Sequence, residues 1–300
     1  MENIKDYSGR WRWNMVNDFR PQSIEYSGIK CYPTANYVNY YGMQNGYPIN
    51  DMTKADAESG YDPTHPWKNR DPRFYKTIMF DGVKWKSTGG AGGTAELFTG
   101  GRESEEANEK KGCFTAYMNS KLCPQLMNTV DGYKENNIMI LSLMRLADVY
   151  LMYAEATAVG YNGPKSKAAP YSLEALDAVN KIRERAGVAP VLDKFLGSTA
   201  DFLSELRRER AVELSFEGFR FIDLRRWMLL TQYPYTLKTK IEFDRADPSD
   251  YNYDEPEENA IKNLREVVLL ERKYTDRHYW YPLPKKDVSM YEGFYQNPGW

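Results

Sequence analysis

The sequence predicts a mainly α-helical protein in which a helical scaffold, residues 138–300, follows a loop-rich region, residues 1–137, that contains short β-hairpins. Most of the 21 glycines and four of the seven tryptophans come before residue 138, and no helical period is sustained there. After residue 138, apolar residues recur at the spacing of helix faces and charged residues occupy the remaining faces. We expect the two regions to form one compact unit.

The overall composition excludes several classes of protein. The 300 residues include 40 basic and 42 acidic side chains, so no net field favours nucleic acid or an anionic membrane surface. The longest apolar stretch, residues 138–144, is far shorter than the roughly 20 residues of a membrane span. The first residues carry no secretory signal as written, so we expect either a cytosolic protein or a chain whose beginning is missing.

The metal-binding residue types do not indicate a metal site. Cys31, Cys113 and Cys123 are odd in number and lack CxxC spacing, so we expect three unpaired thiols and no disulfide framework. The two histidines are isolated from each other. The acidic run at residues 247–254 offers oxygen ligands without EF-hand spacing, and a solvated loop is favoured over a calcium site.

Two short runs in the loop-rich region predict a β-hairpin. Residues 76–80 and 83–85 flank Asp81-Gly82, a pair that closes such turns. The next segment, residues 87–112, combines glycine pairs with a charged run and is typical of a mobile loop. Because loops on a scaffold usually carry the binding groups, we expect ligand contacts in this region.

The first long helix is predicted over residues 141–159. Apolar side chains surround most of it, while Arg145, Asp148 and Glu155 fall within about 80° of one another at 100° per residue. Such a helix should be largely buried, and its charged stripe should join a buried ion network with basic side chains of the next two helices. Gly160 is expected to end it.

Two further helices follow. The second begins with Ser172 as N-cap and ends at Gly187, and it forms a helical hairpin with the first. The third begins at Ser198 and continues to about residue 230. Gly218 lies in its middle, so we expect another group to approach the backbone there. Prolines near the C-terminus exclude a long terminal helix, and the tail should lie extended across the body.

Five blocks of the sequence together resemble the SusD/RagB family. They are WKNRDPRF at 67–74, LADVYLMYAEA at 146–156, VNKIRERAG at 179–187, RERAVELSFEGFRFIDLRRW at 208–227, and YPLPKKD at 281–287 with QNPGW at 296–300. All five occur in the family's order, whereas residues 1–66 resemble the family only in texture. Complete members are longer by about half or more, so the chain is identified as the C-terminal part of a member.

The resemblance implies a scaffold made of a tetratricopeptide-like hairpin and a long helix. It also implies a non-catalytic outer-membrane lipoprotein of the Bacteroidota that captures oligosaccharides, or less often peptides, for a SusC-like TonB-dependent transporter. The full-length protein would be lipid-anchored at the extracellular face, with a signal peptide, a lipidated cysteine and N-terminal helical pairs that are missing here. No cofactor, metal or nucleic acid is implied, and none of the three cysteines can stand for the anchor.

Carbohydrate recognition favours aromatic rings, because the C–H faces of sugars stack on them while amides bind hydroxyls. Asn39, Gln44 and Asn45 are the candidates for hydroxyl binding. Each ring alone is more often part of a core, but we expect at least two to contact ligand. The candidate rings are Trp11, Trp13, Tyr40, Tyr41, Tyr47, Trp67 and Trp85. Trp227 and Trp300 are assigned to packing.

Other functions stay open beside this one. A glycoside hydrolase also needs aromatic subsites, together with two opposed carboxyl groups roughly 5 to 9.5 Å apart. A protein-binding helical-repeat module would explain the helices but leave the aromatic loops unused. In the 69–74 block, Arg70, Asp71 and Arg73 are predicted to form a structural turn and not a ligand contact. The candidate acids of a hydrolase are Asp51, Asp56, Glu58 and Asp62.

Overall fold

A computed structural model describes residues 32–300 except 89, 108, 123–127, 129 and 132–141. The helices are α2 (Ala35–Val38), α3 (Pro72–Thr77), α4 (Leu146–Gly160), α5 (Ala175–Ala186), α6 (Thr199–Glu213), α7 (Phe219–Arg226) and α8 (Lys285–Val288). The strands are β1 (Ile78–Met79), β2 (Met118–Asn119), β3 (Leu237–Arg245) and β4 (Ile261–Glu271). The protein is mainly helical, which confirms the predicted fold class. None of the helices within these ranges is long and apolar enough to span a bilayer.

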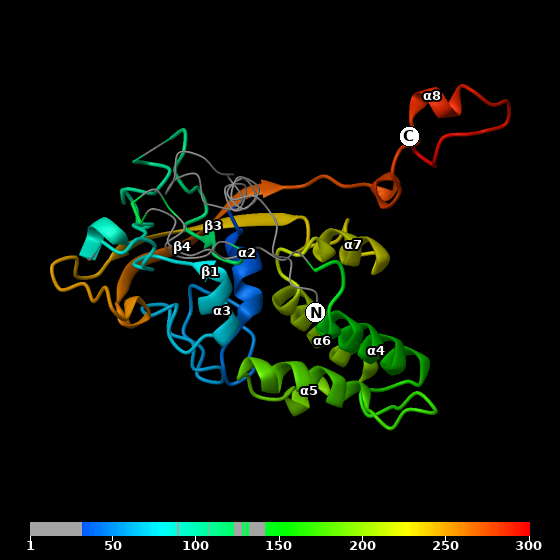
Figure 1. Cartoon of the computed structure of the whole chain (residues 1–300), viewed down its shortest axis with the longest axis horizontal. Helices are drawn as coiled ribbons and strands as arrows, with labels where there is room; N and C mark the ends of the chain where they lie inside the picture. Colours follow the sequence, from blue (N-terminus) through cyan, green and yellow to red (C-terminus); the bar gives the residue numbers. More distant parts are fainter. Residues whose placement is uncertain (1–31, 89, 108, 123–127, 129, 132–141) are drawn as a thin grey trace, which may run out of the picture.

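Helix α4 packs against both α5 and α6, and the three helices form one side of the molecule (Figure 1). Their core includes Leu151 of α4, Val179 of α5 and Phe202 of α6, all fully buried. Helix α5 ends at Gly187, whose φ of 74° lies in the left-handed region that glycine adopts without a Cβ penalty. The hairpin of α4 and α5 and its stop at Gly187 were therefore predicted correctly, but the N-cap of α5 is Glu174 and not Ser172.

The predicted third helix is in fact two helices, α6 and α7. They are separated by residues 214–218, in which Phe216 and Gly218 have φ of 59° and 86°. The break brings the Arg210 guanidinium within 2.9 Å of the Asp223 carboxylate, whereas one straight helix would separate the two by about 20 Å along its axis. A Cβ on Gly218 would meet no atom within 4 Å, so the expected close approach is wrong and the left-handed φ explains the glycine.

One face of α4 is more exposed than the sequence predicts. Leu146, Val149, Met152 and Val159 have exposed fractions of 65, 42, 41 and 59%. The expectation of a largely buried helix was wrong. Apolar residues on every side of a helix indicate that it can be buried. Within the described residues, however, α5 and α6 cover only one side of α4.

The charged stripe of α4 does meet the helices that follow. Asp148 accepts a hydrogen bond from Arg210 at 2.9 Å, and Glu155 accepts from Arg226 at 2.6 Å and from the Trp227 indole at 2.8 Å. Burial by itself raises the pKa of Glu155, but Arg226 and Trp227 outweigh it and lower that pKa below its ordinary value. The predicted ion network is therefore confirmed for basic side chains of the third helical segment, whereas among the described residues the arginines of α5 pair with Glu205, Glu209 and Glu213 of α6 instead.

A second core lies under the loop-rich region and consists largely of aromatic rings. Trp67 stacks on Phe80 with ring centroids 5.0 Å apart, and Phe74 stacks on the same Phe80 ring at 5.2 Å. Phe243 of β3 packs edge-on against Trp67 at 5.3 Å. The core thus joins side chains of residues 32–118 with side chains of β3 and β4.

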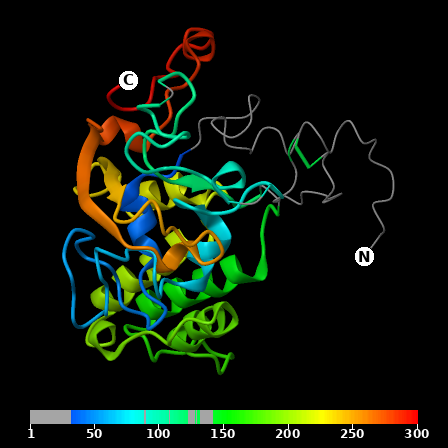
Figure 2. The same ribbon diagram turned by 90° about the vertical axis from the view of Figure 1, so that its left-hand side faces the viewer.

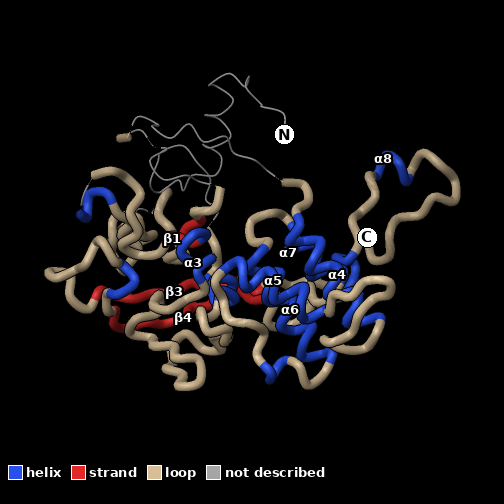
Figure 3. Tube along the Cα trace, turned by 60° about the horizontal axis from the view of Figure 1, so that its bottom comes forward, coloured by secondary structure: helices blue, strands red, loops and turns tan. Residues whose placement is uncertain are grey.

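Strands β3 and β4 form an antiparallel ribbon, drawn in red in Figure 3. Every second residue from Thr239 to Arg245 faces the core. The ribbon lies in the region that was predicted to be a helical scaffold, and the sequence did not predict it. Its inner face is complemented by the aromatic core, whose residues lie far earlier in the chain.

The hairpin expected around Asp81-Gly82 does not form. Strand β1 pairs with β2 instead, across residues 78–79 and 118–119. Asp81 is fully buried and accepts a hydrogen bond from Arg245 of β3 at 2.7 Å. The local turn pattern was present, but a distant arginine determines where this turn packs.

The segment after β4 projects away from the rest of the molecule (Figures 1 and 2). At its base, Arg225 donates to the Tyr279 carbonyl at 3.1 Å and the Tyr279 hydroxyl bonds Thr231 at 3.0 Å. The remainder folds back on itself, with Gln296 bonded to the backbone of Leu283. Its helix α8 has four residues, as the prolines predict, but the expected position across the body was wrong.

Replacing Asp223 by asparagine tests the pair that holds the turn between α6 and α7. Arg210 is 4% and Asp223 is 3% exposed, so the substitution leaves a buried guanidinium short of one carboxylate. We expect the free energy of unfolding to fall by about 3 kcal/mol in urea titrations. Asp250→Asn, in an exposed loop, should change it by less than about 0.5 kcal/mol. Equal effects of the two substitutions would contradict this role.

Candidate functional site

Three of the predicted ligand-contact rings belong to the aromatic core. Tyr41 and Trp67 are 0% exposed and Trp85 is 2% exposed. No ligand can reach these rings in this structure, because neighbouring core side chains cover them. Trp11 and Trp13 lie outside the described residues.

Tyr40 and Tyr47 are half-buried, so part of each ring reaches the surface. A cationic side chain lies over each ring. The Arg220 guanidinium lies 4.8 Å from the Tyr40 centroid, and the Lys194 ammonium lies 4.3 Å from the Tyr47 centroid. Of the predicted rings within the described residues, these two are placed where a ligand could touch them.

A pocket of about 400 Å³ is lined in part by Asn45, two residues before Tyr47, and we call it the amide pocket. The Asn45 side chain joins its walls, because Nδ2 donates to the Ser59 carbonyl at 2.9 Å and Oδ1 accepts from the Tyr47 backbone N–H at 3.2 Å. Gln44 and Asn45 were predicted to bind hydroxyls, whereas Asn39 lies outside the lining. The lining residues are Met43, Gln44, Asn45, Ser59, Gly60 and Asn69, none of which is charged.

Ser59, Gly60 and Asn69 were missed by the sequence reasoning. Nothing in their local pattern indicates a pocket, and they join Gln44 only through tertiary contacts. One such contact is the Gln44 backbone N–H, which donates to the Asn69 carbonyl at 2.9 Å.

Arg70 holds the backbone on both sides of the amide pocket. Its guanidinium is 1% exposed and donates to the carbonyls of Gly42 at 3.0 Å, Pro66 at 2.9 Å and Val38 at 3.1 Å. A buried guanidinium whose donors are satisfied by carbonyls fixes the path of three chain segments. The structural role predicted for this block is therefore confirmed for Arg70.

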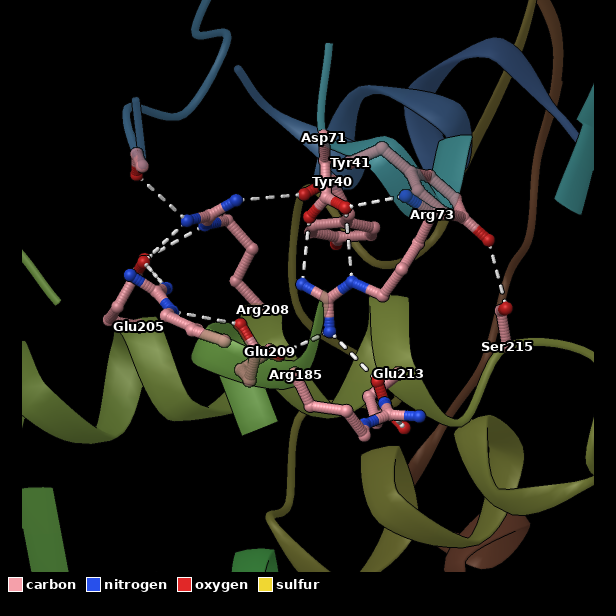
Figure 4. A network of polar contacts seen from close by, with 12 residues as sticks. Tyr40, Tyr41, Asp71, Arg73, Arg185, Glu205, Arg208, Glu209, Glu213 and Ser215 are labelled. Atoms are coloured by element: carbon pink, nitrogen blue, oxygen red, sulfur yellow. Dashed lines mark hydrogen bonds and ion pairs between the residues drawn. The ribbon is translucent and has the colours of Figure 1, made fainter. Parts of the chain in front are cut away.

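The same block is tied to α6. Arg73 donates to the Asp71 carboxylate at 2.7 Å, and to Glu209 at 2.5 Å and Glu213 at 2.9 Å (Figure 4). Asp71 also caps α3 by accepting the Arg73 backbone N–H at 2.9 Å. The charged groups of Asp71 and Arg73 are therefore paired within the protein, as predicted.

Arg208 connects α6 to the pocket segment directly. Its Nη1 donates to the Tyr40 carbonyl at 3.0 Å and its Nη2 to the Gly46 carbonyl at 3.1 Å, while Glu205 neutralises it (Figure 4). A Cβ on Gly42 would lie 2.7 Å from Arg208 Nη1, and the φ of Gly42 is 40°. This position therefore requires glycine, and the arginine can approach the loop only because of it.

A larger cleft of about 570 Å³ lies between α3 and the ends of α4 and α6, but its chemistry is different. Its walls include Arg73, Arg145, Glu213 and Glu217. Arg145 bonds Glu213 at 2.5 Å and Glu217 at 2.8 Å, so these charged groups already satisfy one another. The amide pocket is the better candidate for a neutral ligand because its polar groups are uncharged.

Two of the candidate acids, Asp51 and Asp56, serve local turns, whereas Glu58 pairs with Lys194 at 3.4 Å. Bonds from Lys54 and Thr53 lower the pKa of Asp51 from 3.8 to about 2. Bonds from Ser59 and the Glu58 backbone also lower the pKa of Asp56. A glycosidase needs one carboxylic acid whose pKa is raised, and these two carboxylates are shifted in the opposite direction.

In the part of the chain that the structure describes, no group of three or more His, Cys, Asp or Glu is placed to hold a metal ion. The acidic run at residues 247–254 forms turns: Asp247 accepts from the Ser249 backbone at 3.0 Å, and Asn252 accepts from the Asp254 backbone at 3.0 Å. These bonds are typical of Asx turns.

Known proteins share this sequence pattern and this fold. The SusD family model matches residues 1–300. The chain belongs to the SusD family. The family inferred from the five sequence blocks is thereby confirmed, and the match extends over residues 1–66, where the resemblance of motifs was weakest.

Several solved structures resemble this SusD-family chain, among them two from Bacteroides fragilis. A SusD-like protein from Bacteroides fragilis has a TM-score of 0.68 at 22% identity, over 98% of this chain and 53% of that chain. A SusD-like carbohydrate binding protein from the same species has a TM-score of 0.53 at 20% identity, over 85% of this chain and 46% of that chain. The chain therefore spans about half the length of these solved relatives. Among curated proteins, no sequence matches it.

The buried carboxylate of Glu209 should make stability depend on pH. Burial by itself raises the pKa of Glu209, but Arg73 and Arg183 outweigh it and lower that pKa from 4.5 to about 2. Because the folded pKa is depressed, this stabilisation is complete above the unfolded value and is lost as the pH falls from about 4.5 through 2. Glu209→Gln should lower the melting temperature at pH 7, and its difference from the wild type should shrink over this range.

Glu184→Gln is the matched control, because Glu184 is exposed on α5. Its melting curve should follow that of the wild type at every pH. A difference between Glu209→Gln and the wild type that stays constant from pH 7 to pH 2 would contradict the ionic role of Glu209.

Proposed function

We propose that this SusD-family chain binds neutral oligosaccharides in the amide pocket without changing them chemically. The observation that carries the proposal is the lining of the pocket, which combines three carboxamides and a serine with no charged side chain in about 400 Å³. Carboxamides both donate and accept hydrogen bonds, which suits sugar hydroxyls. The volume is within the range of small-ligand sites.

Tyr47 would supply the ring that stacks on a sugar face. Its backbone N–H bonds the Asn45 side chain, so the residue is attached to the lining of the pocket. The ring is half-buried, which holds its orientation while leaving part of it accessible. Tyr40 is the second proposed ligand-contact ring, on the same stretch of chain.

The proposed role of the binding is nutrient capture. The chain would be part of an outer-membrane lipoprotein that takes oligosaccharides at the extracellular face and passes them to a SusC-like TonB-dependent transporter. Membership of the SusD family supports this role, as does a solved relative described as a carbohydrate binding protein.

A non-catalytic role is proposed because two of the candidate acids, Asp51 and Asp56, are used in turns. A glycoside hydrolase would need an opposed pair, with one member kept protonated at neutral pH. Asp51 and Asp56 accept bonds that stabilise their charged forms, which weakens either as a general acid. Binding without turnover is the function that this arrangement supports best.

Calorimetric titration of the purified chain against neutral oligosaccharides tests the proposal. Gln44→Ala and Tyr47→Ala should each weaken binding by roughly tenfold, because each removes a polar or stacking contact of about 1.4 kcal/mol. Gln232→Ala and Tyr161→Ala are matched controls, since both residues are exposed and lie outside the pocket lining. The controls should bind as the wild type does.

Three outcomes would overturn the proposal. They are binding of no neutral oligosaccharide, binding that Gln44→Ala and Tyr47→Ala leave unchanged, and release of reducing sugar by the purified chain. Titration with unlabelled peptides in the same experiment separates glycan binding from peptide binding. Peptide binding that is lost in both variants would show that the pocket binds peptides, and the proposed ligand class would then be wrong.

A further inference from the structure

Three basic side chains meet where α7, β3 and the end of β4 come together. Arg220 belongs to α7, Lys238 to β3, and Arg272 directly follows β4. In the ribbon, Lys238 pairs with Leu270 and the Arg272 backbone N–H donates to the Thr236 carbonyl at 3.0 Å. Lys238 and Arg272 are therefore diagonal neighbours on one face of the ribbon. We call these three residues the cationic cluster.

Two tyrosine rings border the cationic cluster. The Arg220 guanidinium lies 4.8 Å from the Tyr40 centroid and 5.5 Å from the Tyr235 centroid. A guanidinium between two rings is held in orientation by both of them. Tyr40 is one of the rings that the sequence singled out, and it lies shortly before the first residue of the amide pocket.

The cationic cluster lacks acidic partners. Within the described ranges, neither Arg220, Lys238 nor Arg272 forms an ion pair, in contrast to Arg210 and Arg226, which share Asp223. Arg220 Nη1 is buried and has no hydrogen-bond acceptor. A buried charged donor without an acceptor costs free energy and calls for an explanation.

The charges of the cluster also oppose one another. Burial lowers the pKa of Lys238, and the positive charges of Arg272 and Arg220 lower it further, from 10.5 to about 8. Lys238 makes one long bond, at 3.5 Å, to the Tyr235 carbonyl. Like charges gathered without a counter-ion destabilise the protein, and unfavourable arrangements of this kind are typical of ligand sites.

We propose that Arg220, Lys238 and Arg272 bind an oxyanion group, the carboxylate or sulfate of an acidic oligosaccharide. Arginine offers a planar fork that matches either oxyanion, and lysine adds a third positive donor. The anion would relieve the repulsion among the three cations. The saccharide part rests on the proposed function, whereas the oxyanion site stands without it.

Titration of the full chain at pH 7 with sodium sulfate, a glucuronate-containing disaccharide and its neutral analogue tests the site. Sulfate and the acidic disaccharide should bind, and Lys238→Met and Arg272→Ala should each weaken both by roughly tenfold. Lys262→Met is the matched control, because Lys262 is an exposed residue at the other end of β4. Its affinities should equal those of the wild type.

The melting temperature of the free protein separates a binding role from a structural one. Lys238→Met should raise the melting temperature, because it removes one of three clustered like charges, while it weakens anion binding. A merely structural lysine would lower stability when replaced. A lower melting temperature for Lys238→Met, or anion binding that is absent or unchanged in both variants, overturns the site.

The same titrations keep this inference apart from the proposed function. Sulfate binding that depends on the cluster, without binding of any saccharide, would uphold the oxyanion site and overturn its saccharide part. Neutral oligosaccharide binding that depends on Gln44 and Tyr47, without binding of any anion, would overturn the oxyanion site alone. Tighter binding of the acidic disaccharide than of sulfate would support an acidic glycan as the source of the anion.

Discussion

The structure depends on a row of buried carboxylates along α6. Glu205, Glu209 and Glu213 recur every four residues, so they share one face of the helix, and each is at most 4% exposed. Arginines from other segments neutralise them: Arg73 of α3 binds Glu209 and Glu213 (Figure 4). Arg183 of α5 binds Glu205 and Glu209. Moving α3 or α5 away from α6 would leave the buried carboxylates without their arginines. The row therefore determines where α3 and α5 lie against α6.

Helix α6, which carries this row, also contacts the segment that we propose binds ligand. Arg208, one turn along α6 from Glu205, holds the carbonyls of Tyr40 and Gly46, and Arg70 holds the carbonyl of Gly42 between them. A loop whose backbone is held by buried guanidinium groups loses little further freedom when a ligand arrives. The amide pocket is therefore largely preformed, although Gln44, Asn45 and Asn69 of its lining are exposed.

The two proposed sites differ in what satisfies their polar groups. Around the amide pocket, the charged groups of Asp71, Arg73 and Arg208 are paired internally, and the polar lining side chains are carboxamides and a serine. At the cationic cluster, Arg220 is held by rings and not by a carboxylate, while the nearest acid on its own helix, Asp223, is already bound by Arg210 and Arg226. One stretch of chain, from Tyr40 to Asn45, thus runs between a neutral environment and a positively charged one.

The sequence by itself determined the family, the hairpin of α4 and α5 with its glycine stop at Gly187, and the structural role of Arg70. The family and the hairpin depend on residues that are neighbours in the chain or on motifs kept in order, and the block around Pro72 indicated a turn at Arg70 although the partners of Arg70 lie elsewhere in the chain. Tertiary structure alone decided that Trp67 is buried while Tyr47 reaches the surface, because a tyrosine or tryptophan suits both environments. It also decided where α6 ends and which cations lack a counter-ion, since burial and pairing join residues as far apart as Asp81 and Arg245, 164 positions along the chain.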